Sequence, residues 1–192
     1  MIDRVKIDRT NSTYLIVDMQ TKLAEAMDRE VLSTVAFNIN LVISALKILS
    51  VPILITEQYR KGLGNTLESI VNNLGDEFKP FEKMSFSAWG ELQFQSKLQS
   101  LNRKYVIISG MESHVCVLQT ALDLIDRGYT THIISDATCS RYKSDWDCAM
   151  NYLRDAGAVI STTEILVFQL LQQAGTDEFK AISPMFKNRN RI

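Results

Sequence analysis

Cys116 is the residue whose type and position best suit covalent chemistry. It lies in ISGMESHVCVLQTALDLIDRG, residues 108–128, where an apolar strand passes through Gly110 and a short turn into a helical pattern. The first turn of a helix has unpaired backbone N–H groups and a positive potential, which favour a thiolate and can bind an oxyanion. A cysteine placed there can attack a carbonyl carbon. Taken alone, however, a free cysteine is more often a small buried apolar residue.

Asp18 and Lys83 are the candidate partners of this thiol. Asp18 ends the run TYLIVD, at the sheet edge where α/β proteins form their pockets, and could accept a proton; it could equally cap the turn near Gln20. Lys83 lies in the apolar and aromatic segment PFEKMSF. An ammonium group near Cys116 would lower the thiol pKa and stabilise a negatively charged intermediate. The alternative is a surface lysine paired with Glu82.

Short β-branched runs that are nearly continuous in apolar residues predict the strands of a buried parallel sheet. The predicted strands are Thr13–Val17, Pro52–Thr56, Tyr105–Ser109, Thr131–Ser135 and Ala158–Thr162. Helical periodicity between them predicts helices at Leu32–Leu49, Leu92–Leu101, Val115–Arg127, Asp145–Ala156 and Thr163–Gln173. Gly128 and Gly157 follow two of these helices, at the positions of C-caps.

The alternation of strands and helices predicts a single three-layer αβα domain over residues 1–192, with a mostly parallel, doubly wound sheet. The candidate residues follow three different strand regions, and strand C-terminal ends are where such folds place their sites. Residues 174–192 are predicted to be a C-terminal tail that packs loosely or against another subunit.

Composition narrows the class of protein. The chain has 192 residues, 46% of them hydrophobic, with 21 basic against 22 acidic residues and a net charge of −1. No overall positive field attracts nucleic acid, and no apolar run reaches the roughly 20 residues that span a bilayer. We expect a cytoplasmic protein without a targeting segment. Cys116, Cys139 and Cys148 are expected to be free thiols.

Several motifs together resemble the isochorismatase-like cysteine hydrolases, over most of the chain. They are LIVDMQ around Asp18, EKMSFSAW around Lys83 and GMESHVCVLQTALDLIDRGY around Cys116. The segments TEQYRKGLGNT and SDATCSR are similar to the branch of isochorismatase domain-containing proteins. The resemblance implies that Cys116 attacks an amide-like carbonyl, that Asp18 transfers the proton to the leaving amine and that Lys83 supports the charged states.

The resemblance also implies a backbone arrangement at the site. It places a non-proline cis peptide between Met111 and Glu112 and an oxyanion hole at the N–H groups of Val115 and Cys116. Residues bordering the three segments are candidate pocket residues: Gln20, Tyr59, Leu63 and Trp89. His114 either lines the pocket or has a structural role.

Departures from the family pattern limit the reaction. Zinc-dependent nicotinamidases carry an Asp-x-His pair and a further His after the second strand, where this sequence has Glu57, Gln58 and Tyr59. Because the chain has only 2 histidines, we expect no metal and no cofactor. True isochorismatases act on an enol ether without a nucleophilic cysteine, which makes isochorismate a doubtful substrate.

The sequence therefore predicts a homo-oligomeric hydrolase that cleaves a C–N bond of a small amide through a cysteinyl intermediate. Two alternatives from other classes stay open. One is a binding or scaffold protein that keeps the triad without turnover. The other is an RNA-associated or nuclease role, for which the sequence shows neither a basic face nor a metal site.

Overall fold

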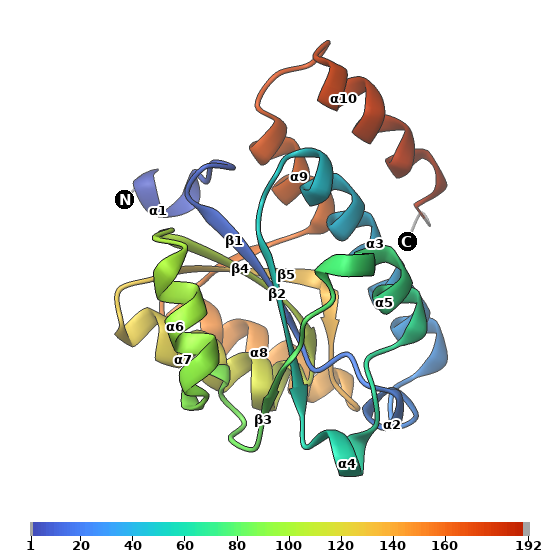
Figure 1. Ribbon diagram of the computed structural model, residues 1–192, viewed down its shortest axis with the longest axis vertical. Helices are drawn as coiled ribbons and strands as arrows, with labels where there is room; N and C mark the ends of the chain where they lie inside the picture. Colours follow the sequence, from blue (N-terminus) through green and yellow to red (C-terminus); the bar gives the residue numbers. More distant parts are fainter. Residues whose placement is uncertain (1, 190–192) are drawn as a thin grey trace.

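Six parallel strands form one sheet, in the order β3-β2-β1-β4-β5-β6 (Figure 1). The computed structural model describes residues 2–189. The strands are β1 (Ser12–Val17), β2 (Ile53–Gln58), β3 (Phe81–Lys83), β4 (Tyr105–Met111), β5 (Thr130–Cys139) and β6 (Val159–Ser161). Because every neighbouring pair of strands is parallel, the predicted parallel sheet is confirmed.

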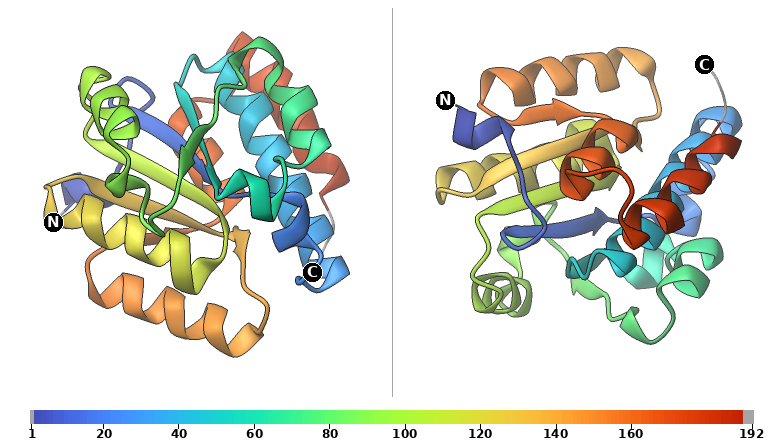
Figure 2. Two further views of the ribbon diagram at one scale, coloured as in Figure 1. Left: turned by 60° about the horizontal axis from the view of Figure 1, so that its bottom comes forward. Right: turned by 90° about the horizontal axis from the view of Figure 1, so that it is seen from above.

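Helices cover both faces of this sheet, which confirms the predicted three-layer fold (Figure 2). One face carries α3 (Arg29–Ile48), α5 (Glu68–Leu74), α9 (Thr163–Leu171) and α10 (Asp177–Ile182). The other carries α6 (Leu92–Ser100), α7 (Leu118–Asp126) and α8 (Lys143–Asp155). The short helices are α1 (Ile2–Val5), α2 (Thr21–Ala24) and α4 (Arg60–Leu63), with 3-10 turns at Gly75–Glu77, Ala88–Gly90 and Ser183–Asn188.

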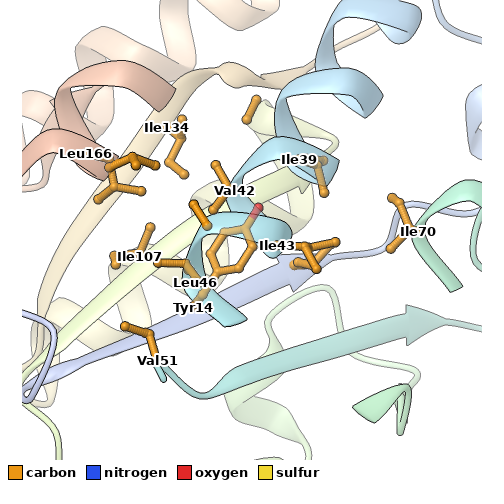
Figure 3. Packing of buried hydrophobic residues seen from close by; sticks show 14 of the residues in the cluster. Tyr14, Ile39, Val42, Ile43, Leu46, Val51, Ile70, Ile107, Ile134 and Leu166 are labelled. Atoms are coloured by element: carbon orange, nitrogen blue, oxygen red, sulfur yellow. The ribbon is translucent and has the colours of Figure 1, made fainter. Parts of the chain in front are cut away.

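The central strand β1 is buried along its whole length, and its side chains belong to the hydrophobic cores on both faces of the sheet. Tyr14 and Ile16 point to the face covered by α3, while Leu15 and Val17 point to the opposite face. Figure 3 shows the Tyr14 ring packed among side chains of α3, including Ile39, Val42, Ile43 and Leu46. Each fully buried side chain of this size stabilises the fold by about 1.5–3 kcal/mol, so the sheet centre is a rigid platform.

Helix α3 begins three residues earlier than predicted, because Asp28 caps it by accepting hydrogen bonds from the backbone N–H groups of Glu30 and Val31. Among residues 2–189, it is the one helix long and apolar enough to cross a membrane by length and composition. Its apolar side chains, however, pack against the sheet and against α5 and α9. The helix is thus the main core helix of this domain.

The segment predicted to be a loose tail, residues 174–192, is folded against the rest of the chain as far as the structure describes it. Ile182 of α10 is fully buried, and the Phe179 ring lies 6.3 Å from the ring of Phe168 on α9. The expectation of loose packing was wrong because these apolar side chains cover the outer surface of α9. Residues 190–192 lie outside the described residues.

The order of the strands determines where a site can form. The chain winds in one direction from β1 to β3 and in the other from β4 to β6, so β1 and β4 meet at the switch point of the sheet. Gly110 of β4 lies beside Val17 of β1 there, and a Cβ atom on Gly110 would come within 2.0 Å of the Val17 carbonyl oxygen. The two strands can therefore approach this closely only with glycine at residue 110.

Candidate active site

The three candidate residues lie at the C-terminal ends of three strands. Asp18 directly follows β1, Lys83 is the last residue of β3, and Cys116 lies in a π-helical turn between β4 and α7. Because the strands are parallel, these ends share one edge of the sheet. The structure thus brings together side chains that are far apart in sequence.

Asp18 and Lys83 form a buried ion pair. Asp18 Oδ2 and Lys83 Nζ are 2.7 Å apart, and both side chains are 0% exposed. The other carboxylate oxygen, Oδ1, accepts a hydrogen bond of 2.7 Å from the Thr56 hydroxyl. Asp18 has a left-handed backbone (φ 49°), which aspartate tolerates better than most residues. Strand geometry and the Thr56 hydrogen bond therefore orient the carboxylate before any ligand binds.

The Cys116 thiol lies near both members of this pair, because the charges of Asp18 and Lys83 and side-chain hydrogen bonds with both affect its pKa. Burial, followed by the negative charge of Asp18, raises the pKa of the thiol from 9.0 to about 12, and Lys83 acts in the opposite direction. The expectation of a lowered thiol pKa is therefore wrong. Burial of the thiol and the closeness of the carboxylate outweigh the effect of the lysine.

The turn that carries Cys116 has one of the two backbone features that the resemblance implies, since the peptide bond between Met111 and Glu112 is cis. The predicted oxyanion hole is not free at Val115, whose N–H donates to the Glu112 carbonyl oxygen at 3.1 Å. The same oxygen accepts from the Val117 N–H at 3.2 Å, which closes the π-helical turn Ser113–Val117. Cys116 thus lies in a wide turn just before α7, and not within the regular helix predicted for this position.

The predicted pocket residues have different outcomes. Gln20 is fully buried, and its side chain is bonded to the backbone of Gln58 and Gly64, so its role here is structural. Tyr59 is 44% exposed, and its N–H donates to the Lys83 carbonyl oxygen. Leu63 is half-buried on α4. Tyr59 and Leu63 thus lie in the segment after β2, and the Tyr59 backbone contacts Lys83.

Trp89 does not lie at the thiol. Its indole packs 6.1 Å from the Tyr129 ring and 4.9 Å from the Arg127 guanidinium, beyond the C-terminal end of α7. Trp89 was therefore wrongly predicted as a pocket residue, since its side chain points away from the start of that helix. His114 is half-buried, and its Nδ1 atom lies 2.9 Å from the Ser140 hydroxyl, so it connects the turn that carries Cys116 to the end of β5.

Thr56 and Gln58 are site residues that the sequence reasoning missed. Thr56 contacts Asp18, and Gln58 Oε1 lies 2.7 Å from Lys83 Nζ. Both belong to β2, which ends in three consecutive polar residues, Thr56, Glu57 and Gln58. The two-residue repeat of a strand points Thr56 and Gln58 to the same face of the sheet, and that could have been read from the sequence.

The position that corresponds to a zinc pair in nicotinamidases has another role. Glu57 is buried and accepts hydrogen bonds from the N–H group (2.8 Å) and hydroxyl (2.7 Å) of Thr66, with Arg60 3.3 Å from its second oxygen. This carboxylate anchors the loop after β2. Within residues 2–189, no group of three or more His, Cys, Asp or Glu side chains is placed to hold a metal ion.

The fold places this cluster of a carboxylate, an ammonium group and a thiol at the switch point of a parallel α/β sheet. Residues 12–165 match the model of the isochorismatase domain family. The chain belongs to this family, which confirms the resemblance seen in the sequence.

Similar proteins and solved structures support this assignment to the family. A secreted isochorismatase effector, Isc1, of Phytophthora sojae is 41% identical over 84% of this chain and 78% of its own length. Isochorismatase domain-containing protein 2 of Danio rerio is 37% identical over 94% of this chain and 89% of its own. The structure of the MAR1 ribonuclease from Caenorhabditis elegans superposes with a TM-score of 0.90 at 32% identity, covering 97% of this chain and 95% of that one.

Proposed function

We propose that this protein is a cysteine hydrolase that cleaves the C–N bond of a small amide through a thioester on Cys116. The observation that supports this most directly is the buried ion pair of Asp18 and Lys83, whose charges both act on the Cys116 thiol. Such an arrangement supplies a nucleophile, a group that takes and returns its proton, and a fixed positive charge. All three are needed for acyl transfer.

The resting state would hold a neutral thiol, since the pKa of Cys116 is raised to about 12. When an amide binds, the thiol proton moves to Asp18 as Sγ attacks the carbonyl carbon. The C–N bond then breaks, Asp18 returns the proton to the leaving nitrogen, and a thioester stays on Cys116. Lys83 offsets the negative charge on the carboxylate and on sulfur throughout these steps.

Water completes the reaction. Asp18 accepts a proton from a water molecule whose oxygen attacks the thioester carbon. When the C–S bond breaks, the same proton passes to the departing sulfur, and the carboxylic acid product leaves. The N–H groups of Val115 and Val117 donate to the Glu112 carbonyl oxygen, so the Cys116 N–H is the backbone donor that would bind the developing oxyanion.

A panel of small primary and secondary amides tests the proposal, with ammonia or amine release as the assay. We expect Cys116→Ser to lose at least about 1000-fold in turnover, because the nucleophile is gone. The exposed Cys148 provides the control Cys148→Ser, which should keep wild-type turnover. Intact-mass spectrometry after rapid quenching should show an acyl adduct on Cys116. Equal turnover of Cys116→Ser and wild type would contradict the mechanism.

Cleavage of RNA is a second candidate, favoured by the name of the C. elegans relative. The test is degradation of a fluorescent single-stranded RNA by wild type, Cys116→Ser and Lys83→Met. If this site cleaves RNA, both variants lose the activity. RNA cleavage that both variants retain would indicate a contaminating nuclease or a different site. With a net charge of −1, the protein offers little electrostatic attraction to RNA, so we favour the amide.

A further inference from the structure

Lys83 is surrounded by more hydrogen-bond acceptors than an ammonium group needs. Its Nζ atom lies 2.7 Å from Asp18 Oδ2, 2.7 Å from Gln58 Oε1, 2.8 Å from the Phe86 carbonyl oxygen and 3.3 Å from that of Ser85. An ammonium group has three N–H bonds, so the protein itself satisfies all of them. The side chain is 0% exposed. Lys83 is therefore held in one position as a buried cation.

Gln58 is the one neutral side chain among these acceptors, and its orientation is fixed. Its Nε2 atom donates to the Met84 carbonyl oxygen at 2.8 Å, which turns Oε1 toward Lys83. If the amide were flipped, its NH₂ group would face the Lys83 ammonium, which cannot accept a hydrogen bond. Gln20 fixes the backbone of Gln58 from both sides, at 2.7 Å from its N–H and 3.0 Å from its carbonyl oxygen.

The neutrality of Gln58 has a chemical consequence. An amide oxygen satisfies one N–H bond of Lys83 without neutralising its charge, so that charge stays available to Asp18 and to Cys116. A carboxylate in the same place would add a second negative charge beside the thiol. The carboxylate of Asp18 already raises the pKa of this thiol, and another would raise it further.

We propose that Gln58 is a positioning residue for the reaction: its side chain holds Lys83 as a fixed cation beside Asp18 and Cys116 without reducing its charge. This inference rests on the proposed function, because it concerns the chemistry of the Cys116 thiol. A purely structural role would be different, since Gln58 would then only tie the end of β2 to the backbone at Met84.

Two substitutions of similar length separate these roles. Gln58→Met removes the acceptor and the donor but adds no charge. Gln58→Glu adds a carboxyl group that, when protonated, can donate to the Met84 carbonyl oxygen and accept from Lys83 as the amide does. When ionised, the same group opposes formation of a thiolate on Cys116. The defect of Gln58→Glu should therefore depend on pH, and that of Gln58→Met should not.

The measurement is kcat/KM for hydrolysis of an amide from the panel by the full-length protein between about pH 4.5 and 9. We expect Gln58→Glu to be within about twofold of wild type at the acid end and at least about tenfold slower at the alkaline end, equivalent to one pKa unit. Gln58→Met should be slower by a constant factor. Gln93→Glu, an added charge on the exposed face of α6, should match wild type.

Three outcomes would overturn the inference. The rate ratio of Gln58→Glu to wild type could be constant across the pH range, or Gln58→Met could react at the wild-type rate. In either case, if Cys116→Ser still abolishes amide turnover, the proposed function stands and only the role of Gln58 fails. Absence of turnover for every amide of the panel, or turnover that Cys116→Ser retains, would reject both together.

Discussion

The carboxylate of Asp18 and the ammonium of Lys83 are 2.7 Å apart with neither side chain exposed to solvent. Neither charged group is hydrated. Hydrogen bonds within the protein replace much of the lost hydration, because Asp18 accepts one from Thr56 and Lys83 donates one to Gln58. Such a pair adds little net stability compared with apolar residues, but removal of one partner leaves an uncompensated buried charge. The pair is therefore better explained by chemistry than by stability.

The first prediction follows from this pair. Lys83→Met should lower the free energy of unfolding by about 3–5 kcal/mol, because it leaves the Asp18 carboxylate buried without a counterion. The double variant Asp18→Asn with Lys83→Met should be markedly less destabilised than Lys83→Met alone. Urea denaturation measures both values.

An exposed pair supplies the control for this prediction. Lys180 and Asp177 form an ion pair in which the side chains are 68% and 97% exposed, so Lys180→Met should cost less than about 1 kcal/mol. If Lys83→Met and Lys180→Met proved equally mild, the assignment of Asp18 and Lys83 as a buried charged pair would be wrong.

The second prediction concerns alkaline pH. The pKa of the Cys116 thiol is about 12 in the folded protein against 9.0 for an ordinary cysteine. As the pH rises from 9 to 12, the unfolded chain therefore releases this proton first and becomes favoured, so the stability supplied by the neutral thiol is lost in this window. Each pH unit is worth about 1.4 kcal/mol at most.

The Cys116→Ser variant tests this dependence, since serine does not titrate there. Its unfolding free energy should fall less steeply than that of wild type above pH 9. The slope for Cys148→Ser, at an exposed position, should equal that of wild type. Parallel curves for wild type and Cys116→Ser would show that the thiol is not shifted by burial.

The fold could be predicted from the sequence largely because the central strands are buried on both faces. The continuous apolar runs of β1 and β4 have no other stable environment in a protein of this composition. Strand β3 could not be predicted in this way. It has three residues, one of them the exposed Glu82, and it exists because its backbone pairs with the end of β2.

The sequence predicted which strand ends form the site, but it did not predict where the side chains near those ends point. Asp18 and Cys116 follow apolar strands, which was visible in the sequence. Gln20 and Trp89 border the same segments, yet one side chain is bonded to backbone and the other points toward the end of α7. The direction of the thiol pKa shift could not be predicted from the sequence either. Burial and the charge of Asp18 raise this pKa more than Lys83 lowers it, and both effects depend on the three-dimensional arrangement.

The third prediction concerns acid pH and His132. This histidine is buried on β5, with Nε2 3.0 Å from the Arg4 carbonyl oxygen, and burial lowers its pKa from 6.5 to about 4. Between these values the unfolded chain binds a proton that the folded protein does not, so stability falls as the pH decreases from 6.5 to 4. The total loss from this group is about 3 kcal/mol.

His132→Gln removes this titration and keeps a hydrogen-bonding side chain. We expect the variant to be destabilised above pH 7 through lost packing, including the ring contact with Tyr105 at 6.0 Å. Its stability should nevertheless change less than that of wild type as the pH falls below 6.5, as measured by urea denaturation in steps of pH. If the stability of His132→Gln fell with decreasing pH as steeply as that of wild type, groups other than His132 would cause the loss of stability in acid.

The fourth prediction concerns Gly110, where β1 and β4 approach each other just before the turn that carries Cys116. Gly110 has a positive φ of 116°, and a Cβ atom there would lie 2.0 Å from the carbonyl oxygen of Val17, which is backbone and cannot rotate away. Gly110→Ala should therefore separate the strands, lower the free energy of unfolding by at least about 3 kcal/mol and displace Cys116 relative to Asp18. Urea denaturation and the rate of Cys116 alkylation measure the two effects.

Gly128 provides the matched control, because it also has a positive φ, 85°, but no atom lies within 4 Å of the position its Cβ would occupy. Gly128→Ala should cost only the backbone strain of about 1 kcal/mol and leave the alkylation rate of Cys116 unchanged. The comparison isolates steric contact between the strands from the conformational preference of glycine. If both alanine variants were equally destabilised, backbone strain alone would explain Gly110, and the close approach of β1 and β4 would not be needed to position Asp18 and Cys116.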